Sequence, residues 1–195
     1  MSASSISLKN TVQNSKNSKK YTWEEFKSRF LSREDGYKYE WVNGFVEKTP
    51  RTMDKTQFYI IQNLQRFFRQ LLFENKANGE LITEGDTFFV NNHRRPDIAY
   101  YTDEQIQSAR DEKNKVVPKF VIEIISNNDQ MNRVHAKMDD YRAANVEVIW
   151  HILPLLKEIH VYNKGITMKV CKGGDICSAS PVLPDFNIKV NDILN

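Results

Sequence analysis

The sequence predicts a mixed α/β fold, in the α/β or α+β class, in which helices cover a mixed β-sheet. The near-continuous apolar run "KFVIEIIS" at 119–126 is typical of a strand buried on both faces. Apolar residues at helical spacing over 54–76 predict a long amphipathic helix. Strand-like segments lie between and after the two longest helices, and this alternation indicates a sheet flanked by helices.

The N-terminal part predicts a short helix, a hairpin and the long helix. Thr22 with Glu25 three residues later is a capping box, which starts a helix that reaches about Leu31. "YEWVNGFVEK" at 39–48 carries Asn-Gly between two apolar-rich arms, a strong hairpin signal. The long helix is expected from about Asp54 to Lys76. Its expected buried face consists of Phe58, Ile61, Leu64, Phe68 and Leu71.

The remainder reads as strands interrupted by two helices. "ELITEGDTFFV" predicts an extended segment bent at Gly85, and "RPDIAYY" predicts a strand with Pro96 at its mouth. Thr102 with Gln105 predicts a short helix or loop, and "QMNRVHAKMDDYRAAN" predicts a second long helix. The last expected elements are a hairpin made by "VEVIWHIL" and "KEIHVYN", a strand "GITMKVC" and a closing segment "LPDFNIKVNDIL".

Length and composition bound the class of protein. With 195 residues, 40% hydrophobic and 27% charged, one globular domain over 21–195 is expected. No run approaches ~18 consecutive apolar residues, so no membrane span is expected. Residues 1–20 hold four lysines and no acid, which predicts a disordered basic tail. The formal net charge of the whole chain is +3, so the remaining residues have a net charge of about −1. Bulk charge therefore does not indicate nucleic-acid binding. Cys171 and Cys177 lack a metal-ligand pattern and read as ordinary thiols of a reducing, cytoplasmic environment.

Two acids interrupt the strand-like runs, Asp97 in "RRPDIAY" and Glu123 in "KFVIEIIS". Alternation places Glu123 centrally on one face of its strand. If the two strands are neighbours, both carboxylates reach one spot, where they repel unless a cation joins them. Carboxylates with waters in the remaining positions suit Mg²⁺ or Mn²⁺. The sequence therefore predicts a divalent-metal site made by Asp97 and Glu123.

Several charged residues are candidates to join this site. Lys137 borders the buried stripe of the following helix and either points its ammonium at the acids or extends outward along its stem. Glu40 on the hairpin and Glu84 before the strand of Asp97 could also join, although a solvated position is the plain alternative for both. The adjacent arginines at 94 and 95 are candidates for phosphate contact or for a solvated strand entrance. The four histidines show no metal-ligand spacing.

"YEWVNG", "RRPDIAY", "PKFVIEIIS", "KMDDY", "VEVIWHILPLLKEIHVY" and "LPDFNIKV", in this order, resemble the Uma-two family of endonuclease-like proteins. That family belongs to the PD-(D/E)XK restriction-endonuclease-like superfamily. The resemblance implies Asp97 and Glu123 as the acids that hold Mg²⁺ and Glu40 as the acid of the first hairpin. The superfamily's lysine would stand two residues after the second acid, but Ile125 occupies that position, and the resemblance places the lysine at Lys137 on the next helix.

Two main hypotheses follow from these residues. The first is a metal-dependent endonuclease that hydrolyses phosphodiester bonds, with DNA favoured by superfamily precedent alone. Its expected site comprises Asp97, Glu123, Lys137 and Glu40, with Arg94 and Arg95 at the nucleic acid. The alternative is a non-catalytic module that binds nucleic acid or protein on a nuclease fold. A phosphodiesterase acting on small molecules is a third possibility. A homodimer is expected for the first hypothesis, because cutting both strands of a duplex needs two active sites.

Overall fold

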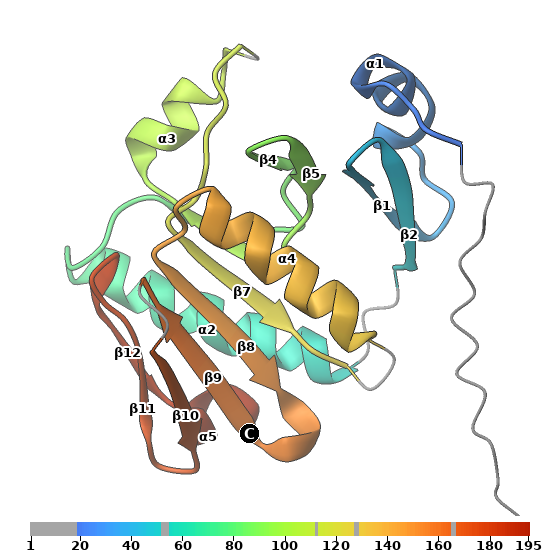
Figure 1. The fold of residues 1–195 in the computed structure, drawn as a ribbon. Coiled ribbons are helices and arrows are strands. Elements are labelled where there is room, and N and C mark those ends of the chain that lie inside the picture. Colours follow the sequence, from blue (N-terminus) through green and yellow to red (C-terminus); the bar gives the residue numbers. More distant parts are fainter. Residues whose placement is uncertain (1–18, 52–54, 112, 127–128, 165–166) are drawn as a thin grey trace, which may run out of the picture.

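A computed structural model describes residues 19–51, 55–111, 113–126, 129–164 and 167–195, so the expected basic tail lies almost entirely outside the described residues. A six-stranded sheet in the order β10-β9-β8-β7-β6-β3 forms its centre (Figure 1). Its strands are β3 (Glu80–Thr83), β6 (Ile98–Tyr101), β7 (Phe120–Ile124), β8 (Val148–Leu153), β9 (Glu158–Asn163) and β10 (Met168–Lys172). Only the β7–β8 pairing is parallel within this sheet. The mixed α/β prediction is therefore confirmed.

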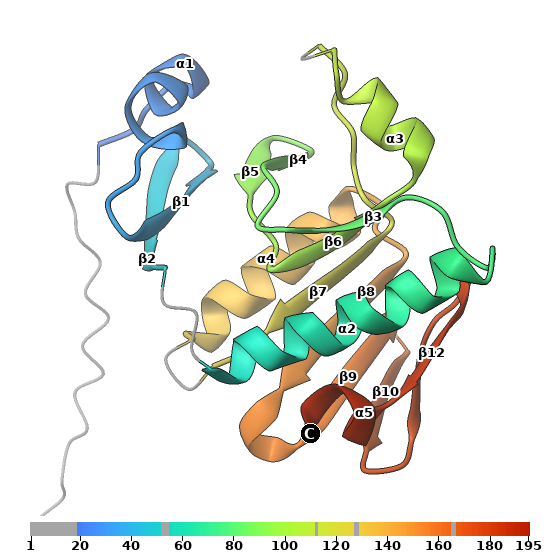
Figure 2. The same ribbon diagram turned by 180° about the vertical axis from the view of Figure 1, so that it is seen from behind.

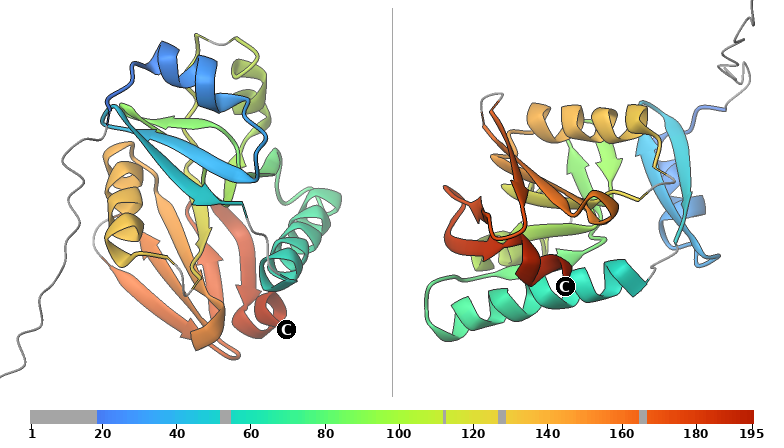
Figure 3. Two further views of the ribbon diagram at one scale, coloured as in Figure 1. Left: turned by 90° about the vertical axis from the view of Figure 1, so that its right-hand side faces the viewer. Right: turned by 90° about the horizontal axis from the view of Figure 1, so that it is seen from below.

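Helix α4 (Met131–Ala143) makes the crossover between the parallel strands β7 and β8 and lies on one face of the sheet. Helix α2 (Lys55–Phe73) lies on the opposite face, as the views from behind and from below show (Figures 2 and 3). Phe120, Ile122 and Ile124 join the core under α2, whereas Val121 joins the core under α4. The alternation expected for β7 is confirmed, and it puts Glu123 on the α4 side.

The buried face of α2 differs in part from the predicted one. Leu64, Phe68 and Leu71 are buried as expected, and Ile60 completes the stripe. Phe58 is wrongly predicted, because 64% of it is exposed. The predicted stripe places Phe58, Ile61 and Leu64 three residues apart, and each spacing is shorter than the ~3.6 residues of one α-helical turn. Together the two spacings rotate Phe58 by about 120° from Leu64 on an α-helix. The expected start of this helix at Asp54 lies outside the described residues.

A second sheet of four strands stands beside the first, in the order β2-β1-β5-β4. Its strands are β1 (Tyr37–Val42), β2 (Phe45–Pro50), β4 (Thr87–Phe89) and β5 (Asn92–Arg94). The predicted Asn43-Gly44 turn joins β1 to β2, with φ of 51° and 87°, the left-handed values that Asn-Gly hairpins adopt. The outer side of the hairpin is covered by α1 (Trp23–Phe26), which has the predicted capping box, and by a π-helical turn, Lys27–Leu31.

Short elements complete the chain. Thr102 and Gln105 form the predicted capping box of α3 (Asp103–Ser108). After β10 come β11 (Ile176–Ala179), β12 (Leu183–Lys189) and the short helix α5 (Val190–Leu194), with a 3-10 turn Pro154–Leu156 between β8 and β9. β11 and β12 pair antiparallel. The two cysteines are free and buried, as expected of ordinary thiols. No helix in the described part of the chain is long and apolar enough to cross a membrane.

The two larger sheets meet where β5 leads into β6. The segment Arg95-Pro96-Asp97 links them, so Asp97 lies just before β6 rather than inside it as expected. Here the hairpin strand β1, which pairs with β5, comes close to the end of β7 and to α4. This junction brings the predicted charged residues together.

Candidate active site

Asp97 and Glu123 face each other across neighbouring strands. Ile98 pairs with Ile122 in the antiparallel β6–β7 register, which places Asp97 opposite Glu123 one step further along. Asp97 is also anchored to β7, because its Oδ2 accepts a hydrogen bond of 2.9 Å from the backbone N–H of Ile124. The expected meeting of these two acids is therefore what the strand pairing produces.

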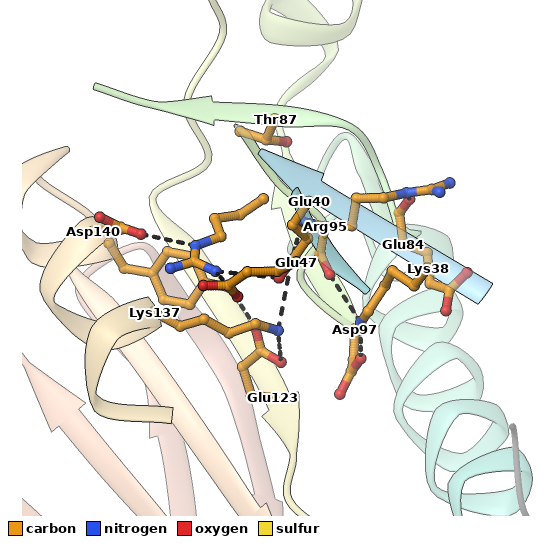
Figure 4. A network of polar contacts seen from close by, with 12 residues as sticks. Lys38, Glu40, Glu47, Glu84, Thr87, Arg95, Asp97, Glu123, Lys137 and Asp140 are labelled. Atoms are coloured by element: carbon orange, nitrogen blue, oxygen red, sulfur yellow. Dashed lines mark hydrogen bonds and ion pairs between the residues drawn. The ribbon is translucent and has the colours of Figure 1, made fainter. Parts of the chain in front are cut away.

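Lys137 points inward from α4 to Glu123 (Figure 4). Its Nζ lies 3.1 Å from Oε1 and 3.0 Å from Oε2 of Glu123, and the hydroxyl of Tyr141, one turn further along α4, donates to Oε1. Burial raises the pKa of Glu123, and Asp97 adds to the increase, while Lys137 opposes it. Burial alone would lower the pKa of Lys137, but Glu123, Glu40 and Asp97 outweigh it, so that pKa is raised. Lys137 thus carries its charge inside the site.

Lys38 on β1 is a second lysine in the site, one that was not predicted from the sequence. Its Nζ donates to Oδ1 of Asp97 at 3.0 Å and to the backbone carbonyl of Arg95 at 3.1 Å. Burial raises the pKa of Asp97, but the charges of Lys38 and Lys137 outweigh it and hold the pKa below its usual value. A signal was available: in "YKYE" the lysine stands two residues before Glu40, so the two share one face of the hairpin. We call Lys38, Asp97, Glu123 and Lys137 the acid–lysine cluster.

Glu40 lies next to this cluster and is almost fully buried. Its Oε1 accepts from the backbone N–H of Arg95 at 2.8 Å and lies 3.7 Å from Nζ of Lys137. Its Oε2 lies 3.3 Å from the guanidinium of Arg94. Burial raises the pKa of Glu40, but Lys137, Lys38 and Arg94 outweigh this effect and lower it. The structure thus brings Glu40 within ion-pair distance of Lys137, and its role in a reaction stays a prediction of the resemblance.

Arg94 is 1% exposed and contacts three carboxylates. Its Nε donates to Asp140 at 2.8 Å, and its NH1 donates to Glu47 at 2.8 Å and to Glu40. The side-chain amide of Asn92 also donates to Asp140, at 2.7 Å. We call these five residues, Arg94, Glu40, Glu47, Asp140 and Asn92, the Arg94 cluster. Burial and this full set of partners argue against the phosphate contact expected for Arg94.

The remaining candidates lie at the edge of the site. Arg95 is less deeply buried than Arg94, and its Nε donates to the backbone carbonyl of Glu84 at 3.1 Å and lies 3.2 Å from Asp86. The carboxylate of Glu84 pairs with Arg51, so Glu84 does not join Asp97 and Glu123. The backbone N–H and the hydroxyl of Ser126, after the end of β7, both donate to the carboxylate of Asp129 and not to Asp97 or Glu123.

The charge balance and the donor atoms of the junction fit a divalent cation. When ionised, the five acids Asp97, Glu123, Glu40, Glu47 and Asp140 face three cations, Lys38, Lys137 and Arg94, which leaves two negative charges. Within the described residues, no group of three or more His, Cys, Asp or Glu side chains is arranged to hold a metal ion. Mg²⁺ commonly binds one or two carboxylates and takes its other ligands from water and phosphate. Asp97 and Glu123 supply such a pair.

Comparison with known families identifies the chain. The profile of the Uma2 family, described as "Putative restriction endonuclease", matches residues 23–191. The chain belongs to this family. The matched region of this Uma2 protein runs from the first residue of α1 into α5, so it includes the two larger sheets, the β11–β12 pair and every residue of the two clusters.

A solved structure shares the fold of this Uma2 protein. It is the crystal structure of a "putative nuclease belonging to DUF820" from Anabaena variabilis ATCC 29413. The TM-score is 0.71 at 16% sequence identity, and the match covers 88% of this chain and 96% of the other. At this identity the likeness concerns the fold alone. No curated protein matches the chain.

Proposed function

We propose that this protein is a metal-dependent endonuclease that hydrolyses phosphodiester bonds, most readily in DNA, with Mg²⁺ or Mn²⁺ held by Asp97 and Glu123. The observation that carries the proposal is the convergence of these two acids from neighbouring strands with the ammonium of Lys137 from α4. Membership of the Uma2 family supports the reaction class. When bound, a divalent cation supplies Lewis-acid polarisation of a phosphodiester and makes water a stronger acid.

The chain's own residues have separate roles in this proposal. Lys137 is fixed by both oxygens of Glu123, so its ammonium is in place to stabilise negative charge that develops on the phosphate. Tyr141 and the backbone N–H of Ile124 orient the carboxylates of Glu123 and Asp97. Glu40 lies within ion-pair distance of Lys137 and thereby helps to hold that ammonium in its charged form.

The proposed partner is duplex DNA, and Arg95 is the arginine of the pair that is available for a phosphate at the rim of the site. Its guanidinium already pairs with Asp86, whose side chain is 44% exposed, so a phosphate can replace that partner without desolvating a new buried group. Cleavage of both strands calls for two active sites, and a homodimer is the simplest arrangement that supplies them.

Titration with Mg²⁺ or Mn²⁺ in the presence of plasmid DNA and of DNA and RNA oligonucleotides tests the proposal. We expect metal-dependent cleavage by the wild-type protein and none by Asp97→Asn, with Mn²⁺ raising the melting temperature of the wild type only. Lys119→Met is a control, because Lys119 lies outside the site and contacts the carbonyl of Asn145. Oligonucleotide binding without cleavage at any metal concentration would instead identify a binding module.

A further inference from the structure

Lys38 contacts Asp97, which is the most exposed side chain of the acid–lysine cluster. The side chain of Asp97 is 19% exposed, compared with 15% for Lys137, 11% for Lys38 and 6% for Glu123. Asp97 also has the more exchangeable partner. Lys137 contacts both oxygens of Glu123, but Lys38 contacts only Oδ1 of Asp97.

Two oxygen atoms meet at the Lys38 ammonium, Oδ1 of Asp97 and the backbone carbonyl of Arg95. Both are hard oxygen donors, the type that Mg²⁺ and Mn²⁺ prefer. The backbone N–H of Ile124 holds the other oxygen of Asp97 and keeps that carboxylate in position if Lys38 leaves. A lysine has a flexible four-carbon stem and three rotatable donors, so its ammonium can move to a new anion without a change in the strand.

We propose that Lys38 is a second working lysine of this site, which competes with the divalent cation for Asp97 and, once displaced, contacts a phosphate of the substrate. The inference rests on the proposed function, because it assigns Asp97 to the metal. In the metal-free protein Lys38 neutralises Asp97. With metal in place, Asp97 has a new partner, and the freed ammonium stays beside the most exposed acid of the cluster, within reach of a phosphate that binds the metal.

The first arm of the test measures metal binding alone. Mn²⁺ affinity is measured by calorimetry and by electron paramagnetic resonance for the wild type, Lys38→Met and Lys48→Met at pH 8. Lys48 is the matched control, since it lies on the next strand of the same hairpin, pairs in register with Tyr39 and thus faces away from Asp97. Loss of a competing charge at Asp97 should tighten Mn²⁺ binding of Lys38→Met by ~10-fold or more, and Lys48→Met should match the wild type.

The second arm measures duplex cleavage at saturating Mn²⁺ over a range of salt concentrations. Lys38→Met should raise KM by ~10-fold. It should also lower the slope of log KM against log salt by about one, as expected for one lost phosphate contact. A lysine that only stabilises the fold would change neither the Mn²⁺ affinity nor this slope.

Lys38→Gln covers the case in which Lys38→Met does not fold. The amide can still donate to Asp97 or to the Arg95 carbonyl but carries no charge, so we expect the same directions of change. Wild-type affinity and salt slope in a folded Lys38 variant of a protein that binds Mn²⁺ and cleaves DNA would overturn the inference and leave the proposed function intact. If neither the wild type nor the variants bind Mn²⁺, both proposals are wrong.

Discussion

The acid–lysine cluster and the Arg94 cluster lie side by side, and Glu40 forms ion pairs with Lys137 of the first and Arg94 of the second. The two clusters neutralise their acids in different ways. In the first, each of two acids has its own lysine, at 3.0 Å in both cases. In the second, one arginine serves three acids. A lysine ammonium is a compact charge that can be exchanged for a metal ion, whereas a guanidinium is planar, always charged and matched to several carboxylates at once.

The acid–lysine cluster can therefore exchange its ion-pair partners, whereas the Arg94 cluster fixes the fold. The Arg94 cluster joins elements that are distant along the chain: Glu40 and Glu47 on the hairpin, Arg94 on β5 and Asp140 on α4. Burial alone would lower the pKa of Arg94, but Glu40, Glu47 and Asp140 raise it, so its charge is permanent. The hairpin is therefore clamped to α4, and the acid–lysine cluster is positioned by that clamp.

Replacement of Arg94 gives the largest expected effect. Arg94→Met leaves three acids without their shared partner, two of them largely buried, and should lower the free energy of unfolding by ~3–5 kcal/mol. Urea denaturation at pH 8 measures it. Arg95→Met is the control, with a loss below about 1 kcal/mol, because the carboxylate of Asp86, the only ion-pair partner of Arg95 among the described residues, is exposed to water. A small loss for Arg94→Met would mean that the clamp does not hold the hairpin.

Lys137→Met tests whether a lysine of the acid–lysine cluster takes part in the reaction. We expect cleavage to fall by ~100-fold, or ~3 kcal/mol of transition-state stabilisation. Lys119→Met, a lysine removed outside the site, should cleave as the wild type does. Normal cleavage by Lys137→Met would show that this lysine has no part in the reaction.

The same variant should lose stability in a pH-dependent way. The pKa of Glu123 is raised in the folded protein, and removal of Lys137 raises it further. A group with a raised folded pKa stabilises the fold below its unfolded pKa and loses that contribution as pH rises through the folded value. Melts of Lys137→Met against wild type should therefore show a larger deficit at pH 8 than at pH 5. An equal loss of stability at pH 5 and pH 8 would mean that Lys137 does not affect the protonation of Glu123.

Much of the fold could be predicted from local patterns, because its longest helix and its buried strand β7 carry periodic apolar residues and several turns and helix starts carry their own signals. The capping box at Thr22, the Asn-Gly turn and the alternation in β7 each depend on neighbouring residues only. β5 was missed because its three residues, "NHR", are polar and carry no apolar pattern. Phe58 was misplaced because a spacing of three residues drifts away from the stripe of an α-helix.

The candidate site could be predicted only where strand order brings residues together. Glu123 and Lys137 belong to one β-α-β unit, so their contact follows from one strand and the helix after it. Lys38 reaches Asp97 across 59 residues and two sheets, a contact that no local pattern encodes. The burial of Arg94 has the same origin, because its partners come from β1, β2 and α4. Adjacent arginines in sequence thus have different environments.

The smallest expected effect comes from Glu47, the most exposed acid that pairs with Arg94, with 25% of its side chain accessible. Glu47→Gln leaves Glu40 and Asp140 on the guanidinium and keeps an oxygen that can accept from NH1. We therefore expect a loss of only about 0.5–1 kcal/mol in urea denaturation. Cleavage rate and Mn²⁺ affinity should be those of the wild type, because Glu47 contacts none of the four residues of the acid–lysine cluster among the hydrogen bonds and ion pairs of the described chain. A tenfold weaker Mn²⁺ affinity in Glu47→Gln would show that the negative charge of the Arg94 cluster also contributes to metal binding. The two clusters could then not be divided into one that exchanges its partners and one that only fixes the fold.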